Sequence, residues 1–352
     1  MAGFEGHAPT RVHGGPDALG VPRFDFSTNS NACGPCPLAL AAVQQANASH
    51  YPDASYTALR TRLAEFHGVP TWRIVLAGSA SEFIFRMTAW VAQKSPSPAL
   101  VSLPPLAYGD YAHAAQAWGL HTTPHPDAAQ LVWACEPASP LGGAHTAWPT
   151  WLADLGADPQ AWPTPQAQAP QPRAPLVLDC AYAPLRLGGA PSLSAQQRNR
   201  VWQLWTPNKA LGLTGVRAAY AIAPEGGQAE QVEMADVAAL ERLCASWPIG
   251  AHGVAMLQAW VQPEVQAWLA QSLQTLQDWK TRQIAMLQAL GWNCLPSEAN
   301  FFCAIAPIAL NVVALRQAGI KLRDATSLGL PGHVRLGVLP PEAQDALALA
   351  LP

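Results

Sequence analysis

Short apolar runs alternate with longer amphipathic runs along this chain from residue 73 onward. Segments such as "RIVLA", "LVWAC" and "PLVLDC" have the length and composition of buried strands, and "SEFIFRMTAWVAQ" has a helical pattern. "ALVSLP", "VWQLWT" and "RAAYAIA" are further predicted strands of this kind. Strands that alternate with helices form a mostly parallel sheet covered on both faces. We therefore predict an α/β fold whose active site lies at the carboxyl ends of the strands.

The C-terminal part of the chain has a different pattern. Residues 228–290 read as long helices, which Pro263 is predicted to kink or divide. Alternation then returns in "WNCLP", "NFFCAIA", "IKLRD" and "HVRLGV", which predicts a smaller α+β domain. We expect an N-terminal arm over residues 1–35, a large cofactor-binding domain over 36–246 and a small C-terminal domain over 247–352.

Charge and composition restrict the kind of partner. Only 12% of the 352 residues are charged and the net charge is −3, which argues against attraction to nucleic acid or anionic lipid and favours a small molecule. No apolar run approaches the ~20 residues of a membrane span, and the first residues lack a signal peptide's apolar core, so we expect a cytoplasmic protein. The segment 157–175 is rich in Pro, Gln and Ala and is predicted to be an exposed loop.

Residues 33–36 carry the four letters Cys-Gly-Pro-Cys of thioredoxin redox sites. That chemistry needs a strand before the motif and a helix N-terminus that lowers the first thiol's pKa, whereas "STNSNA" precedes Cys33 with turn-forming residues. Seven scattered cysteines form neither a disulfide framework nor a paired zinc motif. We interpret Cys33 and Cys36 as reduced thiols in a loop before a helix, with a thiol-redox protein as the alternative.

Five polar residues follow two of the predicted strands. Thr206, Lys209 and Arg217 come after "VWQLW", and Asp179 and Tyr182 come at and after the end of "LVLD". Pyridoxal 5′-phosphate needs an amine for a Schiff base, an acid that keeps its ring nitrogen protonated, and a cradle for its phosphate. These side chains supply each requirement, so the pattern predicts a pyridoxal-phosphate enzyme.

The same residues carry a family resemblance. D-x-A-Y, followed some thirty positions later by [ST]-x-x-K and by Arg eight residues beyond the Lys, resembles the class I/II aminotransferase group of pyridoxal-phosphate fold type I. "HYPDASYTALRTRLAEFHGV" and "GVRAAYAIA" are similar to other segments of that group. The resemblance implies a large domain with a mostly parallel, mixed seven-stranded sheet between helices, a smaller α+β C-terminal domain, and a homodimer.

Segments at the two ends of the chain resemble two different subgroups of this family. "HGG" at 13–15 and "FDFSTNSNACGP" resemble the openings of threonine-phosphate decarboxylases and related enzymes of the cobalamin pathway. "IKLRDATSLGLPGHVRLGV" resembles the ending of histidinol-phosphate aminotransferases. Both imply a small phosphorylated amino substrate. Because of the two N-terminal segments, we favour a threonine-phosphate decarboxylase, with a histidinol-phosphate aminotransferase-like transaminase as the alternative.

The resemblance also implies roles for individual residues. Lys209 would form the Schiff base and then move the proton at the substrate's α-carbon. Asp179 would pair with the ring nitrogen, Tyr182 would donate to the phenolic oxygen, and Tyr108 would stack on the ring. The cofactor phosphate would lie at a helix start and against two further side chains, which together are Gly78, Ser79, Ala80, Ser81, Thr206 and Arg217.

Further roles concern the substrate and a second subunit. Tyr51 matches a tyrosine that reaches the cofactor phosphate of the neighbouring subunit. Arg335 resembles the residue that binds the substrate carboxylate or its equivalent, and Arg323 one that binds a substrate phosphate; either arginine could instead form an interdomain ion pair. His13 and Asn31 are expected to help close the site over a phosphorylated substrate, with a free N-terminal arm as the plainer interpretation of His13.

One position departs from the family pattern. "CEPASPLGG" stands where N-P-x-N-P-T-G is usual, so Ser139 replaces the asparagine that donates to the cofactor's phenolic oxygen. Losing such a charge-assisted bond costs about 1.5 to 3 kcal/mol. A cofactor-binding protein with weak catalysis is therefore a third hypothesis.

Overall fold

The computed structural model describes residues 13–95, 98–154, 173–226 and 230–351. The loop predicted at 157–175 lies outside the described residues except at its end. Among the helices that are described, none combines the length and apolar character that a membrane crossing requires.

The larger sheet has seven strands in the order β2-β8-β7-β6-β5-β3-β4. Its strands are β2 (Ile74–Ala77), β3 (Leu100–Ser102), β4 (His121–Thr123), β5 (Leu131–Cys135), β6 (Leu176–Asp179), β7 (Trp202–Trp205) and β8 (Ala219–Ile222). Strands β4, β3, β5, β6 and β7 are parallel, and β8 runs antiparallel to both neighbours. The mixed seven-stranded sheet implied by the resemblance is confirmed.

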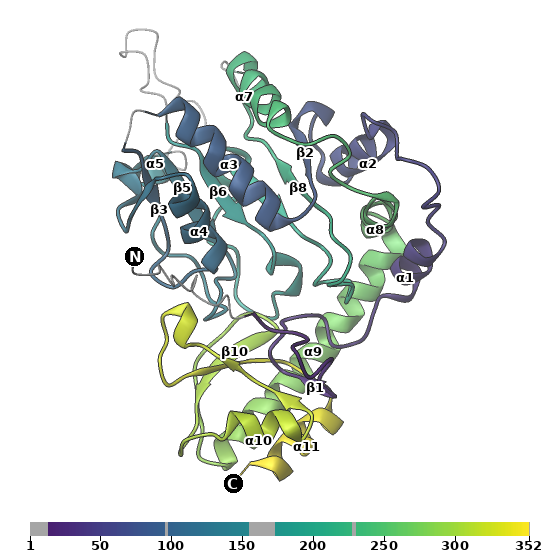
Figure 1. Cartoon of the computed structure of the whole chain (residues 1–352), viewed down its shortest axis with the longest axis vertical. Coiled ribbons are helices and arrows are strands. Elements are labelled where there is room, and N and C mark those ends of the chain that lie inside the picture. The colour runs from purple at the N-terminus through teal and green to yellow at the C-terminus, as the bar shows by residue number, and fades with distance from the viewer. Residues whose placement is uncertain (1–12, 96–97, 155–172, 227–229, 352) are drawn as a thin grey trace, which may run out of the picture.

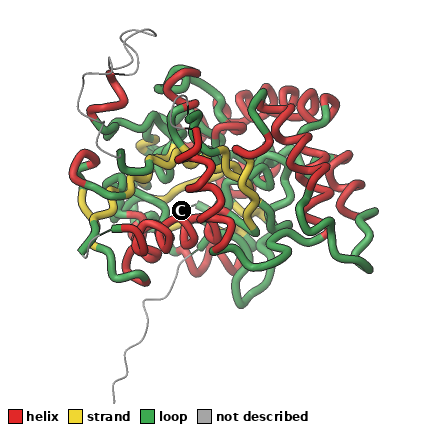
Figure 2. Tube along the Cα trace, turned by 90° about the horizontal axis from the view of Figure 1, so that it is seen from above, coloured by secondary structure: helices red, strands yellow, loops and turns green. Residues whose placement is uncertain are grey.

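Helices cover both faces of this sheet, as Figures 1 and 2 show. Side chains of β2 alternate between the faces: Val75 packs in one buried cluster with Phe83 of α3, and Leu76 in another with Met256 of α8. This alternation with burial on both sides explains why the strands are continuous apolar runs. The helices with their bounds are α2 (Thr57–His67), α3 (Ala80–Lys94), α4 (Gly109–Ala117), α5 (Thr150–Asp154), α6 (Ala195–Asn199), α7 (Glu230–Arg242) and α8 (Ala251–Trp260).

A long helix connects the larger sheet to the C-terminal part. Helix α9 (Pro263–Ala289) extends from beside α8 to the region of α10 (Val312–Gln317) and α11 (Pro341–Ala350) (Figure 1). Pro263 occupies the first turn of α9, where its missing N–H removes no helical hydrogen bond. The predicted division of the helical segment at Pro263 is confirmed.

The smaller sheet is antiparallel and lies at the C-terminal end. Its order is β12-β13-β10-β9, with β9 (Asn293–Cys294), β10 (Phe301–Ile305), β12 (Arg323–Asp324) and β13 (Val334–Gly337). The N-terminal strand β1 (Phe24–Asp25) pairs in parallel with β11 (Ile320–Lys321). Segments from both ends of the described chain therefore meet beside this sheet. The domain boundaries at 35 and 246 stay predictions.

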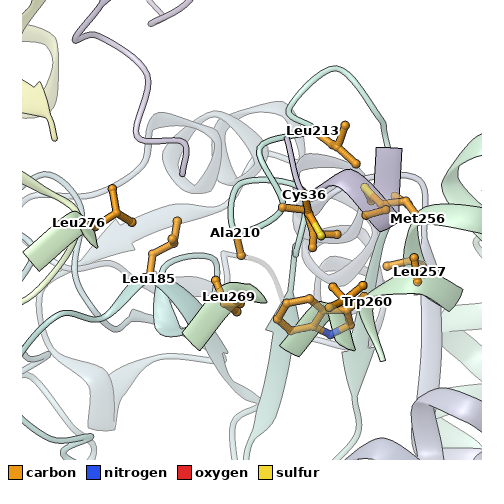
Figure 3. Packing of buried hydrophobic residues seen from close by; sticks show 14 of the residues in the cluster. Cys36, Leu185, Ala210, Leu213, Met256, Leu257, Trp260, Leu269 and Leu276 are labelled. Atoms are coloured by element: carbon orange, nitrogen blue, oxygen red, sulfur yellow. The ribbon is translucent and has the colours of Figure 1, made fainter. Parts of the chain in front are cut away.

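The segment that carries the Cys-Gly-Pro-Cys letters packs onto the largest buried cluster. Cys36 precedes α1 (Pro37–Gln44) and lies in that cluster with Ala210, Leu213 and Met256 (Figure 3). Its N–H donates to the carbonyl oxygen of Leu211 at 2.8 Å. The N-terminal loop is thereby fixed against the segment that follows β7.

Candidate functional site

A cavity of about 890 Å³ lies where the carboxyl ends of the parallel strands face the smaller sheet. Asp179 ends β6, and Thr206 and Lys209 follow β7, so adjacent parallel strands deliver these side chains to one edge. Most of the predicted site residues line this cavity: His13, Ser79, Ala80, Ser81, Tyr108, Ser139, Asp179, Tyr182, Thr206, Lys209, Arg217, Arg323 and Arg335.

Lys209 is half-buried in the cavity wall. Its Nζ lies 5.5 Å from the centre of the Tyr182 ring. The backbone around it is fixed by the N–H of Asn31, which donates to the Lys209 carbonyl oxygen at 2.9 Å. Gly212 has φ +69°, and a Cβ there would come within 2.6 Å of the Gly34 carbonyl oxygen. Only glycine therefore fits that position in the loop.

Asp179 is buried and held by two donors. The Tyr111 hydroxyl donates to Oδ2 at 2.6 Å, and the Ala181 N–H donates to Oδ1 at 2.9 Å. Burial raises the pKa of Asp179 above its usual value, while the Tyr111 hydroxyl, the Lys209 charge and the Ala181 N–H act to lower it. A bound cation or protonated ring would favour the carboxylate further.

Tyr111 is a site residue that the sequence motifs do not predict. Its ring stacks on Trp133 with centroids 4.8 Å apart and an interplanar angle of 12°. Burial raises the pKa of the Tyr111 phenol well above its usual value, so the hydroxyl remains a donor to Asp179. The available signal was its position three residues after Tyr108 in "YGDY". Tyr108 is the N-cap of α4 and Tyr111 lies in its first turn, and the two ring centroids are 5.9 Å apart.

The start of α3 forms one side of the cavity. Ser79 is the N-cap, and its Oγ accepts a hydrogen bond from the Glu82 N–H at 3.0 Å. The Gly78 N–H donates to Glu82 Oε2 at 3.2 Å, and Gly78 does not line the cavity. A Cβ on Gly78 would lie 2.9 Å from the Pro248 carbonyl oxygen, so close packing explains this glycine. Its predicted phosphate contact stays a prediction. Ser81 Oγ shares a hydrogen bond of 3.3 Å with the Tyr108 hydroxyl.

Several polar atoms in the cavity wall are buried and have no hydrogen-bond partner among the described residues. They are Thr206 Oγ1, Asn208 Oδ1, Asn29 Oδ1 and Arg335 Nε. Buried polar groups are normally paired, so such a concentration marks a ligand site. The Thr206 hydroxyl, the nearby Arg217 and the N-terminus of α3 suit an anion, and this donor set fits a phosphate-bearing cofactor. Asn29, a second residue that sequence analysis missed, also donates from Nδ2 to the Tyr182 hydroxyl at 3.3 Å.

Two arginines face each other across neighbouring strands of the smaller sheet. Arg323 of β12 is directly opposite Arg335 of β13, and both line the cavity. Arg335 donates to Ser139 Oγ at 3.1 Å and to the Ser27 carbonyl oxygen at 3.2 Å. Arg323 donates to Ser327 Oγ at 2.8 Å. Burial and the nearby Arg335 charge lower the pKa of Arg323, and an anion between the two guanidinium groups would relieve their repulsion.

Two further predicted residues lie away from the cavity wall. Tyr51 is 77% exposed and stacks on Trp247 with centroids 4.5 Å apart. Asn31 is buried, and its Nδ2 donates to the Ala210 carbonyl oxygen at 3.0 Å and to Ser272 Oγ at 2.9 Å. Asn31 therefore holds the loop that carries Lys209, and its predicted contact with substrate stays a prediction.

The thiols at 33 and 36 have surroundings opposite to those of a redox pair. Both are free, and burial raises the pKa of the Cys33 thiol to about 11. A reactive thiol has a lowered pKa, so this environment does not favour thiolate chemistry. The described residues also contain no cluster of His, Cys, Asp and Glu that could hold a metal ion.

Comparisons with known proteins agree with this geometry. The model of the family "Aminotransferase class I and II" matches residues 159–351. The chain is 27% identical over 348 residues to the histidinol-phosphate aminotransferase of Symbiobacterium thermophilum, covering 93% of this chain and 89% of that protein. The fold is similar to that of histidinol-phosphate aminotransferase from Sinorhizobium meliloti, solved with pyridoxal-5′-phosphate, with TM-score 0.72, 21% identity and coverage of 100% and 98%. It is also similar to L-threonine-O-3-phosphate decarboxylase from Porphyromonas gingivalis, with TM-score 0.68, 19% identity and coverage of 92% and 97%.

Proposed function

Because this chain belongs to the aminotransferase class I and II family, we propose that it is a pyridoxal 5′-phosphate-dependent aminotransferase whose substrate is a small phosphorylated amine similar to histidinol phosphate. The opening segments of the sequence favour the decarboxylase, with this aminotransferase as the alternative. The comparisons support the alternative better, because further curated relatives carry the same histidinol-phosphate aminotransferase description.

The observation that carries the proposal is the convergence of Lys209, Asp179 and the partnerless buried polar atoms on one cavity. The cofactor, when bound, supplies an aldehyde and a ring that stabilises negative charge on the substrate's α-carbon. Lys209 would bind the aldehyde covalently and would move the proton at that carbon. Asp179 would hold a proton on the ring nitrogen, and the Tyr182 hydroxyl would bind the phenolic oxygen.

Other cavity residues position the cofactor and exclude water. The N-terminus of α3, with Ser79 and Ser81, would bind the phosphate together with Thr206 and Arg217. Tyr108, the N-cap of α4, would stack on the ring. Ser139 contributes differently from the asparagine usual in this family, because its hydroxyl accepts from Arg335. A low turnover number with intact cofactor binding would favour the hypothesis of a cofactor-binding protein with weak catalysis.

Reaction type is tested with two substrates. Purified holoenzyme is given histidinol phosphate with 2-oxoglutarate, and glutamate is measured; in parallel it is given phosphothreonine, and carbon dioxide is measured. We expect glutamate from the first mixture and no carbon dioxide from the second. Carbon dioxide release without glutamate would restore the decarboxylase reading.

Arg323→Met is expected to weaken binding of phosphorylated substrates selectively. The variant removes one of the two guanidinium groups that face each other across β12 and β13. The proposed hydrogen bond from Arg323 to the substrate phosphate is charge-assisted, and its loss costs about 1.5 to 3 kcal/mol of binding free energy. KM for histidinol phosphate should rise about 10- to 150-fold, whereas KM for unphosphorylated histidinol should change little. The matched control is Arg282→Met, which removes a guanidinium paired with Asp345 outside the cavity. An equal rise of KM for both substrates would exclude a phosphate contact of Arg323.

Tyr111→Phe is expected to lower kcat about 10-fold or more while leaving KM for the substrate nearly unchanged. The variant keeps the stacking on Trp133 and removes only the hydroxyl that donates to Asp179. Without the hydrogen bond that lowers it, the pKa of Asp179 rises further, and the acid limb of the kcat profile should shift to higher pH. Steady-state kinetics between pH 5 and 9 measure both effects; an unshifted profile with unchanged kcat would contradict the role.

A homodimer is part of the proposal. Tyr51 and Trp247 present an exposed aromatic pair, and Trp247 Nε1 donates to the Pro52 carbonyl oxygen at 3.1 Å, which fixes the pair on the surface. Tyr51 is thus available to the phosphate site of a second copy. Light scattering should give twice the chain mass, and Tyr51→Phe should weaken cofactor retention in that dimer.

A further inference from the structure

A second cavity, of about 460 Å³, lies on the other side of the strands that carry the proposed active site. Leu178 and Cys180 line it, whereas Asp179 between them lines the first cavity. Likewise Trp205 lines the second cavity and Thr206 the first. Alternate side chains of a strand point to opposite faces, so β6 and the end of β7 separate two distinct cavities. The volume lies in the range of small-molecule sites.

Aromatic rings form a continuous wall of this second cavity. Trp260 and Phe66 have centroids 6.0 Å apart, Phe66 and His67 4.9 Å, and His67 and Trp205 5.1 Å. Trp260 and Leu269, which both line the cavity, are labelled in Figure 3. Burial lowers the pKa of His67 to about 4, and its Nε2 shares a hydrogen bond of 2.8 Å with the Tyr220 hydroxyl. At neutral pH this wall is therefore uncharged and suits a planar apolar group.

Charged groups at the cavity differ in whether they are already paired. Glu136 accepts from Arg186 at 2.7 Å and from the Ser192 N–H at 2.8 Å, and Arg186 also pairs with Glu298. Arg186 is thus shared by two carboxylates and is already paired. Arg198 forms no ion pair with the described part of the chain.

Two N–H donors of the cavity residues remain without a partner. Arg198 Nε and Trp205 Nε1 are buried and make no hydrogen bond to any residue within the described ranges. A buried N–H without an acceptor costs about 1 to 3 kcal/mol, and a ligand carboxylate would relieve that cost. The unpaired cation and the two donors make the cavity complementary to an anion that also carries an aromatic ring.

We propose that this second cavity is a binding site for a small aromatic carboxylate, with its ring against Phe66, His67, Trp205 and Trp260 and its carboxylate bound by Arg198 and the Trp205 indole. The site is separate from the proposed active site and does not depend on the reaction assigned there. Its wall includes residues of β6 and β7, the strands that end at Asp179 and precede Lys209.

The test uses 1-naphthaleneacetate as probe and its neutral amide as matched control, titrated into the holoenzyme in a calorimeter. We expect one molecule of 1-naphthaleneacetate to bind per chain. The amide should bind at least about tenfold more weakly, because only the carboxylate gains the charge-assisted bonds. The proposal would be overturned if 1-naphthaleneacetate did not bind at a probe concentration of about 1 mM, or if the two probes bound with equal affinity.

Variants locate the probe. Arg198→Met is expected to weaken binding of 1-naphthaleneacetate at least about tenfold. Trp205→Phe, which keeps an aromatic ring and removes the indole N–H, should weaken it several-fold. The control is Arg200→Met, which lies two residues from Arg198 and outside the cavity. It should bind 1-naphthaleneacetate as tightly as the unaltered protein does. Arg335→Met should also retain binding. Loss of binding in Arg335→Met but not in Arg198→Met would place the probe in the active site and overturn the proposal.

Discussion

Lys209→Ala is expected to abolish turnover, with kcat lowered at least about 10⁴-fold. One amine performs two tasks in the proposed reaction, because it holds the cofactor aldehyde covalently and moves the proton at the substrate's α-carbon. Proton transfer by a positioned side chain alone contributes about 10²- to 10⁴-fold. No other lysine lines the cavity formed by the described residues.

The experiment combines activity with the visible spectrum. Holoenzyme should be yellow, with a band that borohydride bleaches, and Lys209→Ala should lack that borohydride-sensitive band. Lys94→Ala is the matched control, because Lys94 is an exposed residue of α3 that pairs with Asp236 at 2.8 Å. The role of Lys209 would be refuted by a variant that keeps a substantial fraction of the activity and a bleachable band.

Asp179→Asn is expected to give the second largest loss, with kcat lowered at least about 150-fold. The amide cannot stabilise a proton on the ring nitrogen, and removing one partner of a buried charged pair costs about 3 to 5 kcal/mol. Asp179→Glu, which keeps the charge on a longer side chain, should recover part of the activity. Steady-state kinetics of both variants under saturating cofactor measure the effect. Equal activity of Asp179→Asn and the unaltered enzyme would contradict the assignment.

Stability separates this catalytic effect from misfolding. The pKa of Asp179 is raised in the folded state, so the folded state binds more protons and ionised Asp179 makes folding less favourable as pH rises above the unfolded pKa. Replacing it by neutral Asn should therefore leave the melting temperature of the cofactor-free protein at pH 7 unchanged or higher. A variant that is both inactive and much less stable would indicate a structural role instead.

The strands of the larger sheet could largely be predicted, because burial on both faces leaves a continuous apolar run. "LVWAC" coincides with β5, and "PLVLDC" contains β6. β4 was missed because His121–Thr123 is a polar, mostly exposed edge strand without an apolar run. An edge strand packs on one neighbour only, so its sequence need not record its position.

The site was predictable where single motifs carry the chemistry and less so where residues distant in sequence meet. Asp179 ends a strand and Lys209 follows one, so both could be proposed from the sequence, and the structure brings them to one cavity. Tyr111 and Asn29 were missed because their roles depend on contacts with Asp179 and Tyr182, which no local pattern reveals. The pairing of Arg323 with Arg335 depends on strand register, which the sequence does not display.

The central claim is that Lys209 is covalently joined to pyridoxal phosphate in the resting enzyme. Holoenzyme is reduced with borohydride and digested, and the peptides are analysed by mass spectrometry. The account predicts one modified peptide, from the segment that contains Lys209, with the mass of a reduced cofactor adduct on that side chain. An adduct on another lysine, or no adduct after incubation with excess cofactor, would contradict it.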